Sequence, residues 1–337
     1  MTAPAPTAPD ATPRWRRVRD HPATRFLVVR GLLHTAIVLL GVITVTFSLM
    51  LLVPGDPVRI ALGTRYTQES YDALRAASGL DRPLLEQYLD YVLGAVRGDL
   101  GVSFRNGEPV THVLLDRLPA TASLALAGVL VGLLVAVPAG VYAALRNGRL
   151  ADAVVRITSQ VGVSVPDFWM GLLLITLFSA TLGWLPSSGY VPFGEDPVEW
   201  ARRLALPAVT VGLVAGSIMT RFVRAAVLDA IAAGWVRTAR SKGLGRRVVL
   251  LRHILRNAVV PIVTIVGIQM ATLLGGVIVV EVVFAWPGLG RLVYDSVTAR
   301  DYPVIQGAVL LIAVLFLLIN LLVDVIHTLV DPRIRNR

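Results

Sequence analysis

Six long apolar segments constrain this chain more than any other feature of its sequence. They cover residues 32–53, 118–145, 153–182, 204–227, 257–284 and 304–329. Each is long enough to cross a bilayer, which takes about 20 apolar residues in a helix. Because lipid offers no hydrogen bonds to the backbone, helices are the spanning structure that such segments predict. The sequence therefore predicts an all-α integral membrane protein with six transmembrane helices.

Composition agrees with a membrane protein and excludes several other classes. Only 16% of the residues are charged, whereas soluble domains average about 25%. The net charge of +10 can indicate nucleic-acid binding, but the cations lie beside apolar spans, so membrane orientation explains them more simply. With 0 cysteines the chain can form no disulfide, thiolate nucleophile or cysteine-ligated metal site. We therefore expect membrane lipid, and no nucleic acid, as a partner.

The arginine-rich segments indicate how the chain is oriented. If six spans alternate, the arginines before residue 32, at 146–156, at 237–256 and after 331 all fall on one side. Positive loops favour the cytoplasmic side, so both termini are predicted to be cytoplasmic, in the inner membrane. Residues 1–30 read as a disordered basic tail and 331–337 as a short C-terminal tail. The first span is followed by Pro54-Gly55-Asp56-Pro57 in place of a cleavage site, which favours a retained helix.

Residues 56–117 form a polar excursion between the first two spans. Helical spacing and stop signals predict one short helix over 67–78, ended by Gly79, and a second over 83–97, ended by Gly98. Acidic and basic residues are mixed along this excursion, which favours the outer, extracytoplasmic side.

Prolines within or beside the spans predict bent helices. The segment 153–182 is longer than one straight crossing needs and contains Pro166, so we expect a broken or kinked helix there. Pro138, Pro207 and Pro261 are the other candidates. Two interpretations of these prolines remain open. They either only bend the helices that contain them, or they make helices that bend to form a gate.

A basic stretch at 234–257 interrupts the apolar pattern, within a predicted cytoplasmic loop over 228–256. A helix is predicted from Ala225 to Arg240, and Gly243 is placed to adopt the left-handed turn that ends it. A second helix then follows from Gly245, and its predicted apolar face consists of Val248, Val249, Leu251, Ile254, Leu255 and Ala258. The pattern indicates a docking surface, although basic loops beside spans are also general in membrane proteins.

The spacing within this stretch resembles a known family. Ala239, Gly243, His253, Asn257 and Pro261 fall where permease subunits of ATP-binding-cassette importers carry their cytoplasmic loop. The resemblance is to the B-type permeases of the dipeptide, oligopeptide and nickel group, which, like Arg237-Thr238-Ala239 here, depart from the general Glu-Ala-Ala start. Further resemblances are Pro54-Gly55-Asp56-Pro57, residues 281–290 and residues 331–335.

The resemblance implies a type I importer permease fold and a function. A permease of this kind pairs with a similar second permease, two ABC ATPases that bind ATP and Mg²⁺, and an extracytoplasmic substrate-binding protein. It imports peptides or related small solutes by alternating access and forms half of the translocation pathway. The residues implied to couple to the ATPase are Arg237, Thr238, Ala239, Lys242, Gly243, Leu244, His253, Asn257 and Pro261.

The chain itself lacks the motifs of an enzyme. A phosphate-binding loop needs a glycine-rich turn that ends in Lys-Ser or Lys-Thr, and the sole lysine, Lys242, precedes Gly243. ATP hydrolysis is therefore expected on partner subunits, with no cofactor on this chain. The histidines do not have the spacing of a metal-binding pair. Ser217 and Ser296 lack the flanking glycines of the tight turn that carries a nucleophilic serine.

Polar residues in the last span leave a second hypothesis open. Asn320, Asp324 and His327 lie on one helix face at i, i+4 and i+7. They suit either a proton relay in an ATP-independent carrier or channel, or hydrogen bonding between helices near the membrane surface. Glu281 is isolated in sequence, which favours packing or an interfacial position over a role as a ligand. Gly275-Gly276 and the Gly128, Gly132 pair predict close helix packing, including against a second subunit.

Overall fold

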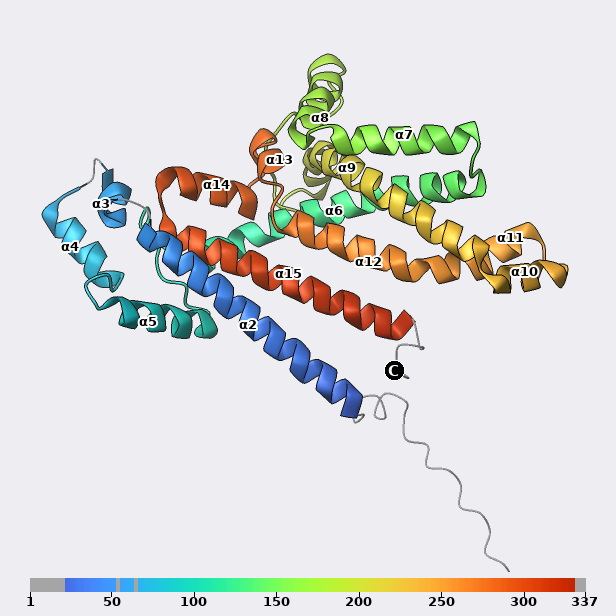
Figure 1. Cartoon of the computed structure of the whole chain (residues 1–337). Helices are drawn as coiled ribbons and strands as arrows, with labels where there is room; N and C mark the ends of the chain where they lie inside the picture. The colour runs from blue at the N-terminus through green and yellow to red at the C-terminus, as the bar shows by residue number, and fades with distance from the viewer. Residues whose placement is uncertain (1–21, 53–54, 64–65, 331–337) are drawn as a thin grey trace, which may run out of the picture.

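The structure is a computed structural model that describes residues 22–52, 55–63 and 66–330 (Figure 1). Residues 1–21 of the tail predicted over 1–30, the tail at 331–337, and Pro54 of the first motif lie outside the described residues. Residues 22–30 belong to the first helix, so the prediction of a disordered tail is wrong there. No described residue belongs to a strand, and long helices dominate the chain. The predicted all-α membrane architecture is confirmed.

Five single helices are long and apolar enough to cross a membrane. They are α2 (Pro22–Leu52), α6 (Val110–Leu145), α9 (Pro197–Ala232), α12 (Leu255–Leu274) with the turns before it, and α15 (Tyr302–Val330). A bent pair supplies the sixth candidate span: α7 (Leu150–Ser164) is followed by α8 (Asp167–Leu174), which continues as the π-helix η2 (Ile175–Thr181). The second span starts at Val110, within the segment predicted as excursion.

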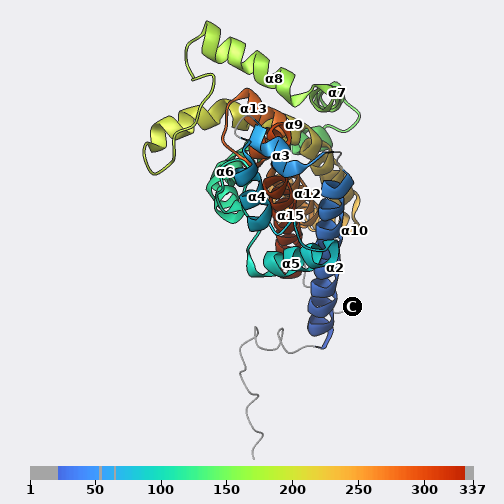
Figure 2. The ribbon, with the colours of Figure 1, turned by 90° about the vertical axis from the view of Figure 1, so that its left-hand side faces the viewer.

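Pro166 is the point at which the bent pair turns. The two halves meet at 100°, and Val165 between them is extended, with φ −80° and ψ 126°. A residue before proline is pushed out of the helical region, and proline itself donates no backbone hydrogen bond. The predicted break at Pro166 is confirmed, and in Figure 2 α8 lies at the edge of the molecule, away from α2 and α15. By contrast, α6 and α9 continue through Pro138 and Pro207.

Two pairs of glycines bring α6 and α9 into close contact at the centre of the fold. Gly128 and Gly132 of α6 face Gly212 and Gly216 of α9, and a Cβ atom at Gly212 would lie only 2.9 Å from the carbonyl oxygen of Gly128. Small residues four apart let helix backbones approach in this way. The close packing predicted for Gly128 and Gly132 therefore occurs within the chain, against α9.

Three short helices form the excursion after α2: α3 (Pro57–Leu62), α4 (Gln68–Ala77) and α5 (Leu84–Arg97). The last two match the predicted pair. Thr67 and Ser70 form a capping box at the start of α4, which satisfies backbone N–H groups of its first turn. Gly98 ends α5 in the left-handed region, with φ 82°.

Asp56 ties the first of these helices to the second. Its carboxylate caps α3 by accepting hydrogen bonds from the backbone N–H groups of Val58 and Arg59. It also accepts a hydrogen bond from the Tyr71 hydroxyl of α4. Burial opposes ionisation of this carboxyl, but the hydrogen bonds outweigh burial and hold the pKa of Asp56 below its ordinary value.

The fifth span ends earlier than the sequence predicts. Residues 257–284 were expected to form one helix, but α12 ends at Leu274, and two short helices follow it, α13 (Ile278–Val283) and α14 (Leu289–Ala299). The reason is Gly276, whose φ of 101° lies in the left-handed region and ends helical geometry. A Cβ atom there would lie 3.2 Å from Cα of Gly290, so Gly276 also allows a tight approach between the two segments.

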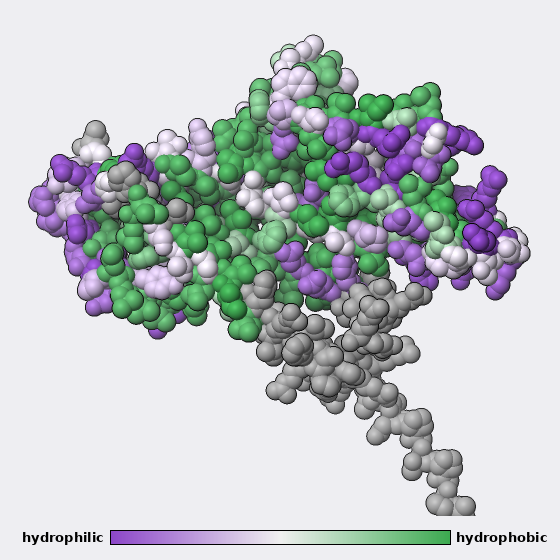
Figure 3. All heavy atoms as spheres, viewed as in Figure 1, coloured by the Kyte–Doolittle hydropathy of each residue, from purple (hydrophilic) through white to green (hydrophobic). Residues whose placement is uncertain are grey.

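Hydrophilic residues gather at the two ends of the body and leave an apolar band between them (Figure 3). One polar end carries α3 and α4, and the opposite end carries α10 (Gly234–Ser241) and α11 (Arg246–Val248) (Figure 1). An apolar band between polar ends is what a membrane-spanning bundle requires.

Candidate functional site

The loop predicted over 228–256, called the basic segment below, forms one polar end of the molecule. It consists of the last turn of α9, then α10, α11 and the π-helix η3 (Val249–Ile254), which leads into α12. The helix predicted from Ala225 to Arg240 is wrong as one continuous element. Ala233 is extended, with ψ 140°, so the chain turns there and α10 starts as a separate helix.

Gly243 makes the second turn of the basic segment. Its φ is 76°, which confirms the predicted left-handed conformation. The Gly243 N–H donates to the carbonyl of Arg240 at 2.9 Å, and the Leu244 N–H to that of Ala239 at 3.4 Å. No other group lies within 4 Å of where its Cβ would be. Backbone conformation, and not lack of room, is therefore what favours glycine here.

The inner face of α10 is anchored in the core of the protein. Val236 and Ala239 are buried and belong to a cluster that also contains Val227, Val249 and Ile254. Val236 and Ala239 lie three residues apart, so they share one face of the helix. Consequently α10 is held firmly against the ends of α9 and α12, and its opposite face is left free.

The predicted apolar face of the second helix is only partly right. Val249, Ile254 and Ala258 are buried, but Val248 and Leu251 are exposed. The predicted face assumed the α-helical repeat, whereas residues 249–254 form a π-helix, in which hydrogen bonds join residues five apart. Residues 249 and 254 therefore fall on the same side, and Leu251 turns outward.

The outer face of the basic segment presents cations and apolar side chains together. Arg237, Arg240 and Lys242 are exposed, and none of them lies within 4 Å of a carboxylate of any described residue. Trp235 and Leu244 are exposed beside them. Unpaired cations around exposed apolar groups are typical of a surface that binds another protein.

The structure brings most of the predicted coupling residues to this end, although they differ in exposure. Thr238 is exposed like the cations, and Ala239 packs inward, so its role is to hold α10. His253 is half-buried, and its ring lies 6.5 Å from the ring of Trp235. The Asn257 amide donates to the carbonyl of His253 at 2.7 Å, and Pro261 lies in the next turn of α12, exposed.

A buried ion pair joins α7 to α9 near the basic segment, and sequence reasoning missed it. The Arg224 guanidinium binds both carboxylate oxygens of Asp152, at 2.6 and 2.9 Å, and also the side-chain oxygen of Asn147 at 3.0 Å. The Asp152 side chain is 2% exposed. The available signal was Arg224 itself, because a charge inside a predicted span requires a partner.

The proposed proton-relay face on α15 forms a contact between helices. His327 Nε2 lies 3.0 Å from the Thr264 hydroxyl of α12, Asn320 is half-buried, and Asp324 is exposed. These residues do not converge on an enclosed polar path. The geometry favours the second interpretation, hydrogen bonding between packed helices.

Glu281 of α13 lies in a hydrogen-bonded network with the start of α6 and of α14. It is fully buried and accepts from the Thr121 hydroxyl at 3.0 Å and from the backbone N–H of Arg291 at 2.8 Å. Trp286 donates its indole N–H to the carbonyl of Ala120 at 2.8 Å. These bonds fix α13 and α14 to the start of α6, which agrees with the packing interpretation of Glu281.

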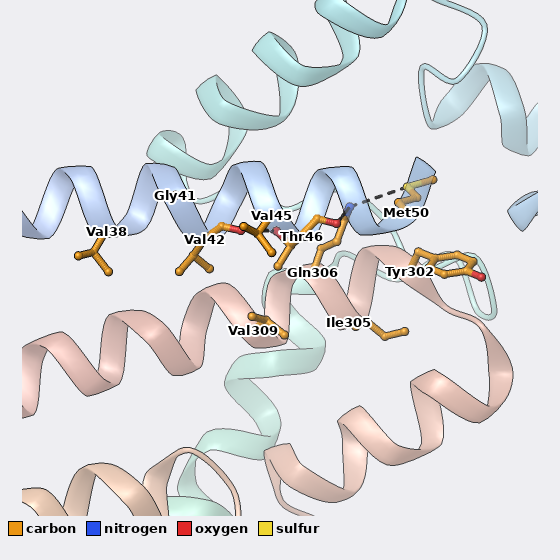
Figure 4. A pocket seen from close by; sticks show the side chains of 10 residues that line it. All are labelled: Val38, Gly41, Val42, Val45, Thr46, Met50, Tyr302, Ile305, Gln306 and Val309. Atoms are coloured by element: carbon orange, nitrogen blue, oxygen red, sulfur yellow. Dashed lines mark hydrogen bonds between the residues drawn. The ribbon is translucent and has the colours of Figure 1, made fainter. Parts of the chain in front are cut away.

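Two hollows lie away from the basic segment. A groove of about 620 Å³ separates α2 from α15 (Figure 4); it is lined by apolar side chains and by Gln306, whose amide donates to the carbonyl of Thr46 at 3.2 Å. A smaller pocket of about 340 Å³ beside the first turns of α6 is lined partly by Glu108, Asp116 and Arg117.

Comparison with known proteins gives consistent matches over nearly the whole chain. Residues 136–336 match the family described as binding-protein-dependent transport system inner membrane component, and residues 23–125 match its N-terminal part. The chain is 41% identical over 319 residues to the di/tripeptide transport system permease protein DppB of Pseudomonas aeruginosa, covering 88% of this chain and 95% of that one. It is 38% identical over 322 residues to the dipeptide transport system permease protein DppB of Escherichia coli, with the same coverage.

Solved structures with this fold come from the MetNI methionine ABC transporter in inward-facing conformations. Two crystal forms align with TM-scores of 0.52 and 0.55 at 21% identity, covering 66% of this chain and 99% of the solved chain. At this identity the likeness concerns the fold alone. Together with the family match, it establishes the class of the protein. The chain belongs to the family of binding-protein-dependent transport system inner membrane components, and it is an integral membrane permease subunit of an ABC importer.

Proposed function

We propose that this permease forms one half of the translocation pathway of an ATP-driven peptide importer. Its basic segment would transmit the conformational change of a separate ATPase to the transmembrane helices. The relatives reported above are named for dipeptide and di/tripeptide transport, which supports peptides as the substrate class. The other half of the pathway would be a second, homologous permease.

The observation that carries this proposal is the shape of the basic segment. α10 projects at one end of the body (Figure 1), is anchored by Val236 and Ala239, and exposes Trp235 and Arg237, with Leu244 exposed in the turn that follows it. A short helix fixed on one face and free on the other can pass a push from a docked protein into the helices behind it, because packed cores move as rigid units.

The remaining partners follow from the placement of the two polar ends. The positive-inside rule puts the basic segment and both termini in the cytoplasm, where two ABC ATPases would hold ATP and Mg²⁺. The opposite end, with α3, α4 and α5, would then receive the extracytoplasmic substrate-binding protein. Alternating access would open the pathway to each side in turn.

An ATP-independent carrier is not favoured. Of its candidate relay residues, Asn320, Asp324 and His327, the last contacts the Thr264 hydroxyl in the packing between α12 and α15. The family to which the chain belongs depends on a binding protein for transport.

The test is copurification with the ATPase that is co-expressed with this chain, using a matched pair of glycine variants. Gly243→Val places a β-branched residue at φ 76°, whereas Gly245→Val places it at φ −60°, where valine is unstrained. Both sites are exposed and open, so both variants should insert normally. We expect the Gly243 variant to lose binding-protein-stimulated ATPase activity and the Gly245 variant to retain it.

A third variant tests the contact surface without changing the backbone. Leu244→Asp places a charge on the exposed apolar rim and should reduce the amount of ATPase that copurifies. If no ATPase binds the wild-type complex, and the purified chain alone moves solute down a proton gradient, the proposed function is wrong.

A further inference from the structure

The half of α9 next to the basic segment is uncovered along one stripe. From Leu204 to Gly212 the helix is largely buried by its own chain. Beyond Leu213, Ser217 is half-buried and packs against Gly162 of α7, whereas Arg221, Ala225 and Asp229 are exposed. These four residues are spaced four apart, so they lie on one helix face. The helix therefore changes from a covered element to an open one halfway along its length.

The chemistry of this stripe differs from that of the faces built to meet lipid. On α6 the exposed residues at the same spacing are Leu126, Leu130 and Leu134, all apolar, as a lipid-facing surface requires. The stripe on α9 instead carries a guanidinium and a carboxylate, with the exposed ring of Phe222 beside them. Charged groups within such a surface need water or a polar partner.

Arg221 is the residue whose position most needs an explanation. It lies within the span predicted over 204–227, and its described contact is long, 3.5 Å from its guanidinium to the side-chain oxygen of Gln160 on α7. No described carboxylate lies within 4 Å of it, whereas Arg224, almost one turn further, is paired with Asp152. Charged residues within spans face protein partners or a water-filled cavity. Among the described residues, Arg221 has no anionic partner.

We propose that this stripe lines the aqueous translocation pathway and that Arg221 contacts the terminal carboxylate of the peptide as it passes. This inference rests on the proposed function as a peptide importer. A guanidinium binds a carboxylate through two parallel hydrogen bonds. Every unmodified peptide carries that carboxylate whatever its side chains, so a single arginine can serve a varied set of substrates. The side chains of Ser217, Ala225 and Asp229 are small or polar, so the path beside Arg221 stays hydrated.

The first arm of the experiment tests whether the stripe faces water. The chain contains 0 cysteines, so single cysteines can be introduced directly. Arg221→Cys and Ala225→Cys are compared with Leu130→Cys, in the assembled importer in lipid nanodiscs, using a charged, membrane-impermeant thiol reagent. We expect the two stripe positions to react at least tenfold faster than position 130. Equal and slow reaction at all three positions would show that the stripe is covered by lipid or by another subunit, and would overturn the inference.

The second arm tests the contact with the carboxylate. Arg221→Gln is compared with Arg202→Gln, an exposed arginine at the far end of the same helix, in proteoliposomes with saturating peptide-loaded binding protein. The substrates are one peptide with a free carboxylate and the same peptide with an amidated C-terminus. We expect Arg221→Gln to lower import of the free peptide at least tenfold, to leave the amidated peptide unchanged, and to preserve stimulated ATPase activity. Equal effects on both peptides would overturn the inference.

The two proposals fail in different ways. If the wild-type importer does not couple ATP hydrolysis to peptide import, the proposed function itself fails. If the wild type imports peptide and Arg221→Gln leaves the ratio of free to amidated import unchanged, only the role of Arg221 fails.

Discussion

Gly132 of α6 and Gly216 of α9 lie so close that a Cβ atom on Gly216 would be 3.1 Å from both Cα and the carbonyl oxygen of Gly132. Both of these are backbone atoms, so they cannot rotate away from an added methyl group. The two longest helices of the fold are therefore held together by the absence of side chains at this point.

The first prediction concerns this contact. Gly216→Ala should destabilise the protein by about 1–3 kcal/mol, because overpacking forces the two helices apart. The matched control is Gly194→Ala, since no other group lies within 4 Å of a Cβ at Gly194. Thermal unfolding of the purified variants measures the difference. A Gly216 variant as stable as the wild type would mean that α6 and α9 separate without cost.

The second prediction concerns the buried pair between Asp152 and Arg224. Arg224→Met leaves the buried carboxylate without its partner and should cost about 3–5 kcal/mol. Adding Asp152→Asn removes the unpaired charge and should recover part of that loss. Arg156→Met is the control, because Arg156 is more exposed and lies 3.8 Å from Asp152, so its loss should cost at most about 1 kcal/mol. A double variant no more stable than the single one would contradict the explanation.

The third prediction is a pH dependence of the excursion. The folded-state pKa of Asp56 is lowered below the ordinary value of 3.8, so the unfolded state binds the proton more readily. The stabilisation is therefore present above about pH 3.8 and is lost as the pH falls through the folded-state pKa. Over that interval the protection of α3 and α4 against hydrogen exchange, measured relative to the intrinsic exchange rate at each pH, should fall in the wild type. The same protection should change less with pH in Asp56→Asn. Identical profiles would show that this carboxylate does not hold the two helices together.

The fourth prediction separates the importer from a proton-coupled carrier. Asp324→Asn should leave ATP-dependent transport within about twofold of the wild type, because α15 contributes here to helix packing and not to an enclosed polar path. Uptake into proteoliposomes is measured with and without a protonophore. Loss of uptake in the variant, together with sensitivity to the protonophore, would restore the carrier hypothesis.

Local sequence signals accounted for much of the fold. The break at Pro166, the end of α5 at Gly98 and the left-handed turn at Gly243 each depend on one residue and its neighbours, so the sequence alone predicts them. The end of α12 was missed because Gly276 and its approach to Gly290 involve a contact between segments. The true apolar face after Gly245 was missed because a π-helical turn leaves no periodic signal in so short a run.

The position of the basic segment was predictable from the sequence, but the exposure of its residues was not. The spacing from Ala239 to Pro261 located the basic segment, but it could not distinguish the inward-packed Ala239 from the exposed Arg237 beside it. The pairing of Asp152 with Arg224 joins residues 72 positions apart, and no local pattern encodes such a separation.

The length of α9 has a mechanical consequence. Its 36 residues extend about 54 Å, well beyond the roughly 30 Å of a bilayer core. The glycine contact with α6 falls near its middle: about 23 Å of helix lies between Pro197 and Gly212, and about 24 Å between Gly216 and Ala232. A straight rod that tilts about its midpoint moves its two ends in opposite directions. If α9 tilts about this contact, a displacement of its α10 end to one side would move the opposite end by a similar distance the other way.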